Sequence, residues 1–164
     1  MATQLKNLSD FSGTTIPSAA PFSFAIIAAE WNAEVTLALY NGAYHALVDN
    51  GALPENTQSY WVPGSFELTS AADMVLNTTS ADAVICLGCV IQGETRHFDF
   101  ICNAVANGLS NVAVKYTKPV IFGVLTQDNQ QQAVDRAGGK HGNKGVEAGV
   151  TAIKMAQLGK TLGT

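Results

Sequence analysis

The sequence predicts an α/β fold in which helices cover both faces of a central parallel sheet. Four strand-like segments alternate with segments whose apolar residues recur at helical spacing. The strand-like segments are apolar throughout, which is typical of strands that are buried on both faces. With 164 residues, the chain is long enough for one domain with a full hydrophobic core.

The predicted strands and helices follow one another in a regular order. Runs rich in β-branched and aromatic residues predict strands over residues 22–29, 58–62, 83–91 and 119–126. Apolar residues at helical spacing predict helices over residues 35–47, 66–76, 98–112, 129–136 and 142–158. The pairs Asn50-Gly51 and Gly138-Gly139 are stop signals after the first and the fourth of these helices.

The first part of the chain differs in composition from the rest. Residues 1–21 carry Ser, Thr, Gly and two prolines, so we expect an extended N-terminal arm there and a folded domain over residues 22–164. The N-terminus has no apolar signal core, and the apolar runs are far shorter than a membrane span. These observations favour a cytoplasmic protein without a membrane partner.

Charged residues are few and unevenly distributed. They make up 13% of the chain, against a usual share of about 25%, so we expect subunit contacts to bury much of the surface. A net charge of −4 argues against non-specific binding of nucleic acid. Residues 1–90 hold one basic residue against eight acidic ones, so an anion site must take its cations from the C-terminal half or from another subunit.

The three cysteines do not indicate a metal site. Cys86 and Cys89 have the C-x-x-C spacing of zinc and redox motifs, but both fall in an apolar strand-like run. Residues three apart on a strand point to opposite faces, so these two side chains cannot grip one metal. We therefore interpret them, with Cys102, as small apolar residues of a protein from a reducing compartment.

The segment Gly88–Asp99, GCVIQGETRHFD, connects a predicted strand to a predicted helix. The start of a helix offers free backbone N–H groups and a positive dipole end, which together suit a phosphate. His97 lies in the same turn and adds a group that exchanges protons near neutral pH. This combination indicates acid/base chemistry on a phosphate-bearing substrate, although taken alone His97 fits a surface or capping role equally well.

Three further clusters are expected at the sheet edge where ligands bind in such folds, two directly after a predicted strand and one after the predicted helix at residues 129–136. Trp31 can stack on a planar heterocycle or simply pack against the domain. Ser65 and Glu67 can meet a ligand or cap the helix that follows them. Residues 136–145 combine glycines with Arg and Lys and can form a phosphate site or a basic connection between helices.

Taken together, these clusters resemble the lumazine synthase family of riboflavin biosynthesis. The resemblance runs from about Phe22 to Leu158 and is carried by VPGSFEL (62–68), GCVIQGETRHFDF (88–100), PVIFGVLT (119–126) and DRAGGKHGNKGVEA (135–148). It implies a flavodoxin-like three-layer α/β/α sandwich around a four-stranded parallel sheet. It also implies condensation of 5-amino-6-(D-ribitylamino)uracil with 3,4-dihydroxy-2-butanone 4-phosphate to 6,7-dimethyl-8-ribityllumazine, without a metal or an organic cofactor.

The resemblance implies a role for individual residues by position. His97 matches the proton-transfer residue, and Lys144 is a further candidate ligand contact. The positions that match the phosphate substrate's site are Glu94, Thr95 and Arg136. The positions that match the pyrimidine site are Trp31, which stacks on the ring, Ser65, Phe66, Glu67, Cys89, Val90, Ile91 and Phe122. Of these two sets, Phe122 and Arg136 match residues that a neighbouring subunit contributes.

The sequence departs from the family pattern near the anion site. Gln92 stands where many members have Arg or Lys, so binding of phosphate is expected to depend more on Arg136. Glu94 places a carboxylate there, and we expect only its backbone N–H to serve the ligand. Trp31 replaces the commoner Phe and keeps the stacking face.

The resemblance also implies an assembly of subunits, and two other activities are possible on the same fold. The resemblance implies a homo-oligomer, a pentamer or a multiple of it up to a sixty-subunit shell, with the N-terminal arm on a neighbour's sheet edge. One alternative is the archaeal-type riboflavin synthase, against which Thr95 and Arg136 argue because it needs no butanone phosphate site. The other is a non-enzymatic flavin-binding or shell protein, against which His97 and Arg136 argue.

Overall fold

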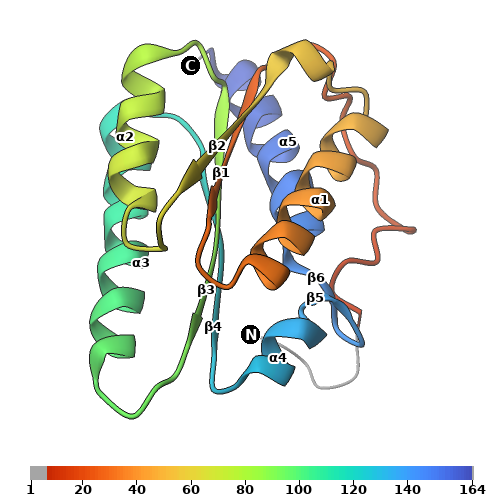
Figure 1. Ribbon diagram of the computed structural model, residues 1–164. Coiled ribbons are helices and arrows are strands. Elements are labelled where there is room, and N and C mark those ends of the chain that lie inside the picture. Colours follow the sequence, from red (N-terminus) through yellow and green to blue (C-terminus); the bar gives the residue numbers. More distant parts are fainter. Residues whose placement is uncertain (1–6, 164) are drawn as a thin grey trace.

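A four-stranded parallel sheet forms the centre of the molecule (Figure 1). The structure, a computed structural model, describes residues 7–163. The sheet strands are β1 (Phe24–Ala29), β2 (Thr57–Val62), β3 (Ala83–Ile91) and β4 (Val120–Gln127), in the order β2-β1-β3-β4. The helices are α1 (Ala33–Asp49), α2 (Leu68–Thr78), α3 (His97–Tyr116), α4 (Gln130–Asp135) and α5 (Lys144–Leu162), with a 3-10 turn at Pro54–Asn56. A small antiparallel pair, β5 (Ala137–Gly139) and β6 (Gly142–Asn143), precedes α5.

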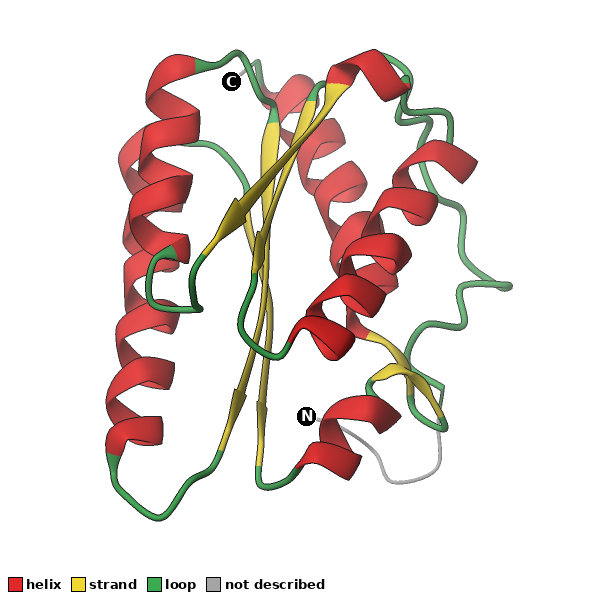
Figure 2. Ribbon diagram, in the orientation of Figure 1, coloured by secondary structure: helices red, strands yellow, loops and turns green. Residues whose placement is uncertain are grey.

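The helices cover the sheet in two layers, α1 with α5 on one face and α2 with α3 on the other (Figure 2). Neighbouring strand residues point to opposite faces, so the sheet feeds two apolar cores. Ile26 and Ile85 pack with Leu39 of α1 in one core, whereas Ile27 and Cys86 pack in the other, against α2 and α3. This arrangement confirms the predicted three-layer α/β/α sandwich with a four-stranded parallel sheet.

The central strands differ in length in a way that shapes one end of the sheet. β1 pairs with β3 only as far as Ala28, which lies opposite Leu87. β3 continues beside β4 to the pair Ile91 and Gln127, so its last residues project beyond the end of β1. The chain order also reverses between β1 and β3, and such switch points are where open α/β sheets bind ligands.

The predicted elements are all present, but two features differ from the expectation. The prediction that every strand is buried on both faces is wrong for the two edge strands, since residues 58–61 of β2 and Phe122 and Thr126 of β4 are exposed. β2 is an edge strand, and its half-exposed Trp61 contacts the ring of Tyr40 of α1, with the ring centroids 5.4 Å apart. The β5–β6 pair was predicted only as a glycine-rich connection, because segments of two and three residues carry no periodicity.

The residues that precede β1 lie along the α1 and α5 side of the molecule (Figure 1). Residues 7–21 contain no helix or strand. Ala19 is fully buried, and its N–H donates to the carbonyl of Asn50 at 2.8 Å. The hydroxyl of Ser9 donates to the carbonyl of Asn143 at 3.0 Å. The first six residues of the predicted arm lie outside the described residues, so the arm's boundary and its place on a neighbour stay predictions.

Candidate functional site

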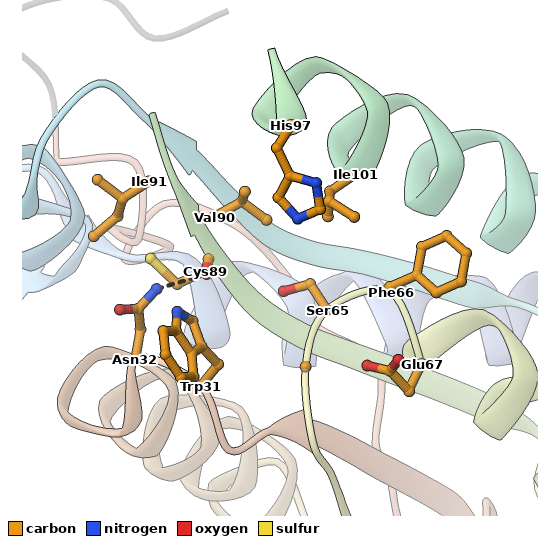
Figure 3. Close-up of a pocket in the computed structure, with 11 residues that line it drawn as sticks. Trp31, Asn32, Ser65, Phe66, Glu67, Cys89, Val90, Ile91, His97 and Ile101 are labelled. Carbon is orange, nitrogen blue, oxygen red and sulfur yellow. Dashed lines mark hydrogen bonds between the residues drawn. The ribbon is translucent and has the colours of Figure 1, made fainter. Parts of the chain in front are cut away.

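A cavity of about 620 Å³ lies at the carboxyl end of the sheet, over the projecting end of β3 (Figure 3). Its volume falls within the range of roughly 300–1,000 Å³ that is usual for small-molecule sites. Its walls come from the segments that follow β1 and β2, from β3 itself and from the start of α3. The lining residues are Trp31, Asn32, Gly64, Ser65, Phe66, Glu67, Cys89, Val90, Ile91, His97 and Ile101.

β3 provides an apolar floor for this cavity. Cys89 is 2% exposed, and burial raises the pKa of its thiol to about 11, so the sulfur stays neutral. Cys86 is fully buried on the other face of the strand, which confirms that the two cysteines point apart. All three cysteines are free thiols. The floor therefore suits the flat, uncharged part of a ligand.

Trp31 lies at the rim of the cavity, in the connection between β1 and α1 (Figure 3). Its side chain is 72% exposed, so a face of the indole ring is free to meet a planar ligand. The next residue, Asn32, has a left-handed backbone conformation and turns the chain from the strand into the helix. The site thus has one aromatic wall opposite the side chain of His97.

The segment between β2 and α2 brings polar groups to the cavity. Ser65 is buried against Gly88 of β3, where a Cβ would come within 2.5 Å of the Ser65 oxygen. No side chain caps the start of α2, so the predicted capping roles of Ser65 and Glu67 are not observed. The Ser65 hydroxyl and the Glu67 carboxylate make no side-chain hydrogen bond or ion pair within residues 7–163, which leaves both groups available to a ligand.

His97 begins α3 and directs its imidazole into the cavity from the side opposite Trp31 (Figure 3). The Thr95 hydroxyl accepts a hydrogen bond from the His97 N–H at 3.4 Å, which fixes the turn before the helix. Glu94 and Thr95 are exposed and lie outside the lining of the cavity. The amide of Gln92 donates to the carbonyl of Gly93 at 2.8 Å. The loop thus sets exposed N–H groups and a histidine beside one another at the positive end of a long helix.

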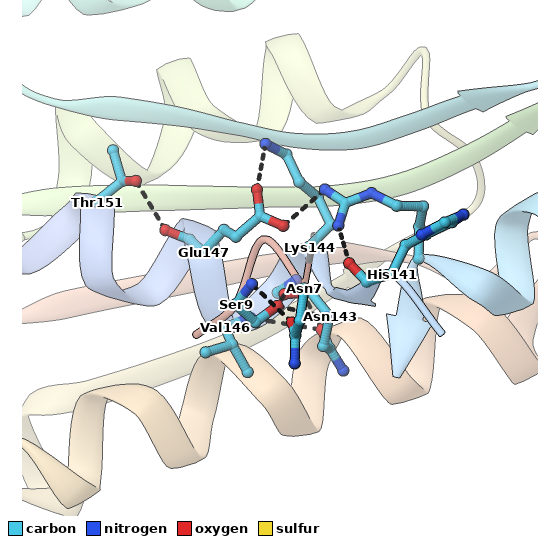
Figure 4. Close-up of polar contacts among 10 residues, drawn as sticks. Asn7, Ser9, His141, Asn143, Lys144, Val146, Glu147 and Thr151 are labelled. Carbon is cyan, nitrogen blue, oxygen red and sulfur yellow. Dashed lines mark hydrogen bonds and ion pairs between the residues drawn. The ribbon is translucent and has the colours of Figure 1, made fainter. Parts of the chain in front are cut away.

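Phe122, Arg136 and Lys144 do not reach this cavity. Phe122 lies midway along β4, opposite Cys86, and is partly exposed at the sheet edge. The Arg136 guanidinium contacts the Glu147 carboxylate at 2.6 Å and donates to the carbonyl of His141 at 2.8 Å. Lys144 contacts the same carboxylate at 3.3 Å (Figure 4). The two predicted cations therefore form one cluster around Glu147, away from Trp31 and His97.

Four residues of the two sites were not predicted individually as site residues. Gly64 and Ile101 line the cavity beside residues that were predicted, and Asn32 does so directly after Trp31. Glu147 lies inside the DRAGGKHGNKGVEA motif, yet only the fold reveals that it holds Arg136. Only Asn32 had a signal in the sequence: an asparagine just after a strand indicates a left-handed turn, because Asn tolerates that conformation better than most residues.

No group of three or more His, Cys, Asp or Glu side chains within residues 7–163 could hold a metal ion. No helix in the same range is long and apolar enough to cross a membrane.

Comparison with known proteins links the fold and the cavity to one family. A family model for 6,7-dimethyl-8-ribityllumazine synthase matches residues 21–160. The protein of that name from Cytophaga hutchinsonii is 57% identical over 94% of this chain and 97% of its own length. Those from Flavobacterium johnsoniae and Parabacteroides distasonis are 52% and 48% identical, each over 96% of this chain and over 83% and 99% of their own lengths. The chain belongs to the 6,7-dimethyl-8-ribityllumazine synthase family.

Proposed function

We propose that the cavity over β3 binds the pyrimidine substrate of a lumazine synthase and that the loop before α3 binds the phosphate substrate. The observation that carries this proposal is that all the residues expected at the pyrimidine, apart from Phe122, line one cavity together with His97. These residues come from three separate segments of the chain. Their meeting in one place is what a shared ligand requires.

The reaction follows from membership of the family. The chain condenses 5-amino-6-(D-ribitylamino)uracil with 3,4-dihydroxy-2-butanone 4-phosphate, which gives 6,7-dimethyl-8-ribityllumazine, phosphate and water. It is an enzyme of riboflavin biosynthesis and a transferase. The shared name of its relatives gives no support to the riboflavin synthase or non-enzymatic alternatives.

The cavity supplies the groups that this chemistry needs. Trp31 stacks on the pyrimidine, the backbone from Cys89 to Ile91 runs along the heterocycle, and Glu67 accepts from the ribityl hydroxyls. Amine attack on the ketone, loss of phosphate and ring closure all move protons, and His97 transfers them, a role typically worth ~10²–10⁴-fold in rate. Holding both substrates close together in the reactive orientation lowers the barrier by up to ~7–11 kcal/mol.

A neighbouring subunit completes the site in this proposal, since Phe122 and Arg136 lie away from the cavity of their own chain. The subunits would form a pentamer or a multiple of pentamers, up to a sixty-subunit shell, with residues 1–21 reaching a neighbour. Large apolar side chains that are exposed on the single chain support burial between subunits. They include Phe66, Met74, Phe100, Val114 and Leu162.

We place this assembly in the cytoplasm, with small-molecule substrates and without nucleic acid, membrane, metal or cofactor as partners. The three free thiols support a reducing compartment. The net charge of −4 supports the absence of a nucleic-acid partner.

The test is an absorbance assay for the lumazine product with both substrates, with light scattering on the same sample. We expect His97→Ala to slow turnover by about 10- to 1000-fold while binding of the pyrimidine persists, because only proton transfer is lost. His45→Ala is the matched control, since His45 is an exposed histidine on α1 that lies outside the cavity. Unchanged turnover in His97→Ala, or riboflavin formed from lumazine alone, would contradict the proposal.

A further inference from the structure

Asn32 has a backbone conformation that residues with a side chain rarely adopt. Its φ of 60° and ψ of 46° are left-handed. Among the non-glycine residues of 7–163, only Thr117 shares a positive φ, and Thr117 ends α3, where such conformations are common. Asn32 instead lies between β1 and α1, at the wall of the proposed pyrimidine site. Because this conformation is strained for a residue with a Cβ, it persists only where surrounding contacts hold it.

The side chain of Asn32 supplies that hold. Its amide Nδ2 donates to the carbonyl of Cys89 at 2.9 Å (Figure 3). Cys89 lies on the part of β3 that projects beyond β1, after the last β1–β3 pair, Ala28 with Leu87. The amide thus joins the two strand ends at the point where the backbone ladder between them has stopped.

Backbone hydrogen bonds anchor Trp31 and the residue before it to the end of β2. The N–H of Trp31 donates to the carbonyl of Pro63 at 3.2 Å, and the N–H of Glu30 donates to the carbonyl of Val62 at 2.7 Å. Since its indole is 72% exposed, packing of the ring itself does little to fix its position. The backbone that carries the ring is thus held by three anchors, two to the end of β2 and one, through Asn32, to β3.

We propose that Asn32 is a positioning residue for the stacking wall: its amide ties the connection after β1 to β3 and so fixes the indole of Trp31 before the ligand arrives. This inference rests on the proposed pyrimidine site. A wall that is already in place does not have to be ordered by the ligand, so less of the binding free energy is lost. Asn meets both demands, because it tolerates the left-handed turn and carries the donor.

The variant Asn32→Gly separates the two demands. Glycine adopts the left-handed conformation without steric cost but has no amide side chain. Asn32→Asp is the second variant, because it keeps the size of the side chain and replaces the N–H donor by an oxygen that faces a carbonyl oxygen. Thr117→Gly is the matched control, since it introduces the same residue at the other left-handed position, remote from the cavity.

The mobility of Trp31 is measured in a Trp61→Phe background, where Trp31 is the one tryptophan left. We expect lower fluorescence anisotropy and stronger acrylamide quenching in Asn32→Gly and Asn32→Asp, and no change in Thr117→Gly. Unaltered mobility in Asn32→Gly would overturn the inference. This measurement needs no substrate, so it tests the tether even if the purified chain makes no lumazine, a result that would instead overturn the proposed function.

Steady-state kinetics then show whether the tether serves the pyrimidine. Loss of one hydrogen bond predicts a rise of about two- to tenfold in KM for the pyrimidine, with KM for the butanone phosphate unchanged. Equal rises in both KM values would indicate general loosening of the fold and would overturn the positioning role. So would an unchanged KM for the pyrimidine in a variant whose Trp31 has become mobile.

Discussion

Glu147 is the residue whose replacement tests the cation cluster most directly. Arg136 and Glu147 are only 12% and 16% exposed, and their side chains meet at 2.6 Å. Glu147→Gln keeps the shape of the side chain and removes its charge, so both Arg136 and Lys144 lose their common anionic partner. We expect this single change to lower stability and to release the cation that the proposed phosphate site needs.

The magnitude follows from the two contacts. A hydrogen bond to a charged group contributes about 1.5–3 kcal/mol, and the longer contact with Lys144 adds little, so we expect a loss of roughly 2–3 kcal/mol. For a chain of this size, 1 kcal/mol shifts Tm by about 2–4 °C, so Tm should fall by roughly 4–12 °C. The assay is thermal unfolding of both proteins at one concentration, because subunit association would make Tm depend on concentration.

A second ion pair provides the control. Lys115 and Asp73 meet at 2.5 Å, but their side chains are 59% and 39% exposed, and water screens such pairs. Asp73→Asn should therefore leave Tm almost unchanged. If Glu147→Gln changed Tm no more than Asp73→Asn does, the buried pair would not stabilise the fold and the reasoning from its burial would be refuted.

Three further predictions rest on particular groups. Of the three thiols, Cys102 alone is partly exposed, so a thiol reagent at pH 8 should modify one cysteine in the native protein and all three after unfolding. Hydrogen bonds from Lys140 and Gln131 hold the pKa of Asp135 below its ordinary value of 3.8. The stability that the charged carboxylate contributes is therefore present above that pH and is lost as the pH falls through the lowered pKa. Urea titrations should show that Asp135→Asn loses less stability on acidification than the parent protein does. Gly88→Ala places a Cβ against the Ser65 oxygen and should lower stability by about 1–3 kcal/mol, with partial recovery in the double variant that also carries Ser65→Gly.

Each of these has an outcome that contradicts it. Rapid modification of all three native thiols would show that the strand cysteines are accessible. If the free energy of unfolding fell equally with decreasing pH in both proteins, Asp135 would not be held in its charged form. Additive losses in the double variant would show that Gly88 and Ser65 do not press on each other.

The fold was predictable because its signals are local. β3 was predicted with its observed bounds, because a run of nine apolar residues that is followed by turn residues favours a buried strand. The exposure of β2 was not predictable, because the composition of a strand does not show whether it lies at the centre or the edge of a sheet. The residues of the cavity were predictable where they follow strand ends in contiguous motifs.

The remaining features of the site depend on contacts between distant parts of the chain. Asn32 and Cys89 are 57 positions apart, and no sequence pattern indicates that the amide of one meets the carbonyl of the other. The role of Arg136 at the phosphate stays a prediction, and its observed partner Glu147 lies in α5, after a turn whose path the sequence leaves open. Such pairings appear only once the strands and helices have been placed.

The charge of the cavity supports the proposal that a neighbouring subunit completes the site. Glu67 is its one formally charged lining residue besides the titratable His97, so no lysine or arginine lines the cavity to balance a phosphate dianion bound at the start of α3. Arg136 of the predicted phosphate site and Lys144, the further candidate ligand contact, are gathered around Glu147 instead. Activity per mole of chain should therefore fall on dilution below the concentration at which subunits separate, while quenching of Trp31 by the pyrimidine persists. Full turnover in an isolated subunit, established by light scattering on the assayed sample, would show that a single chain supplies both halves.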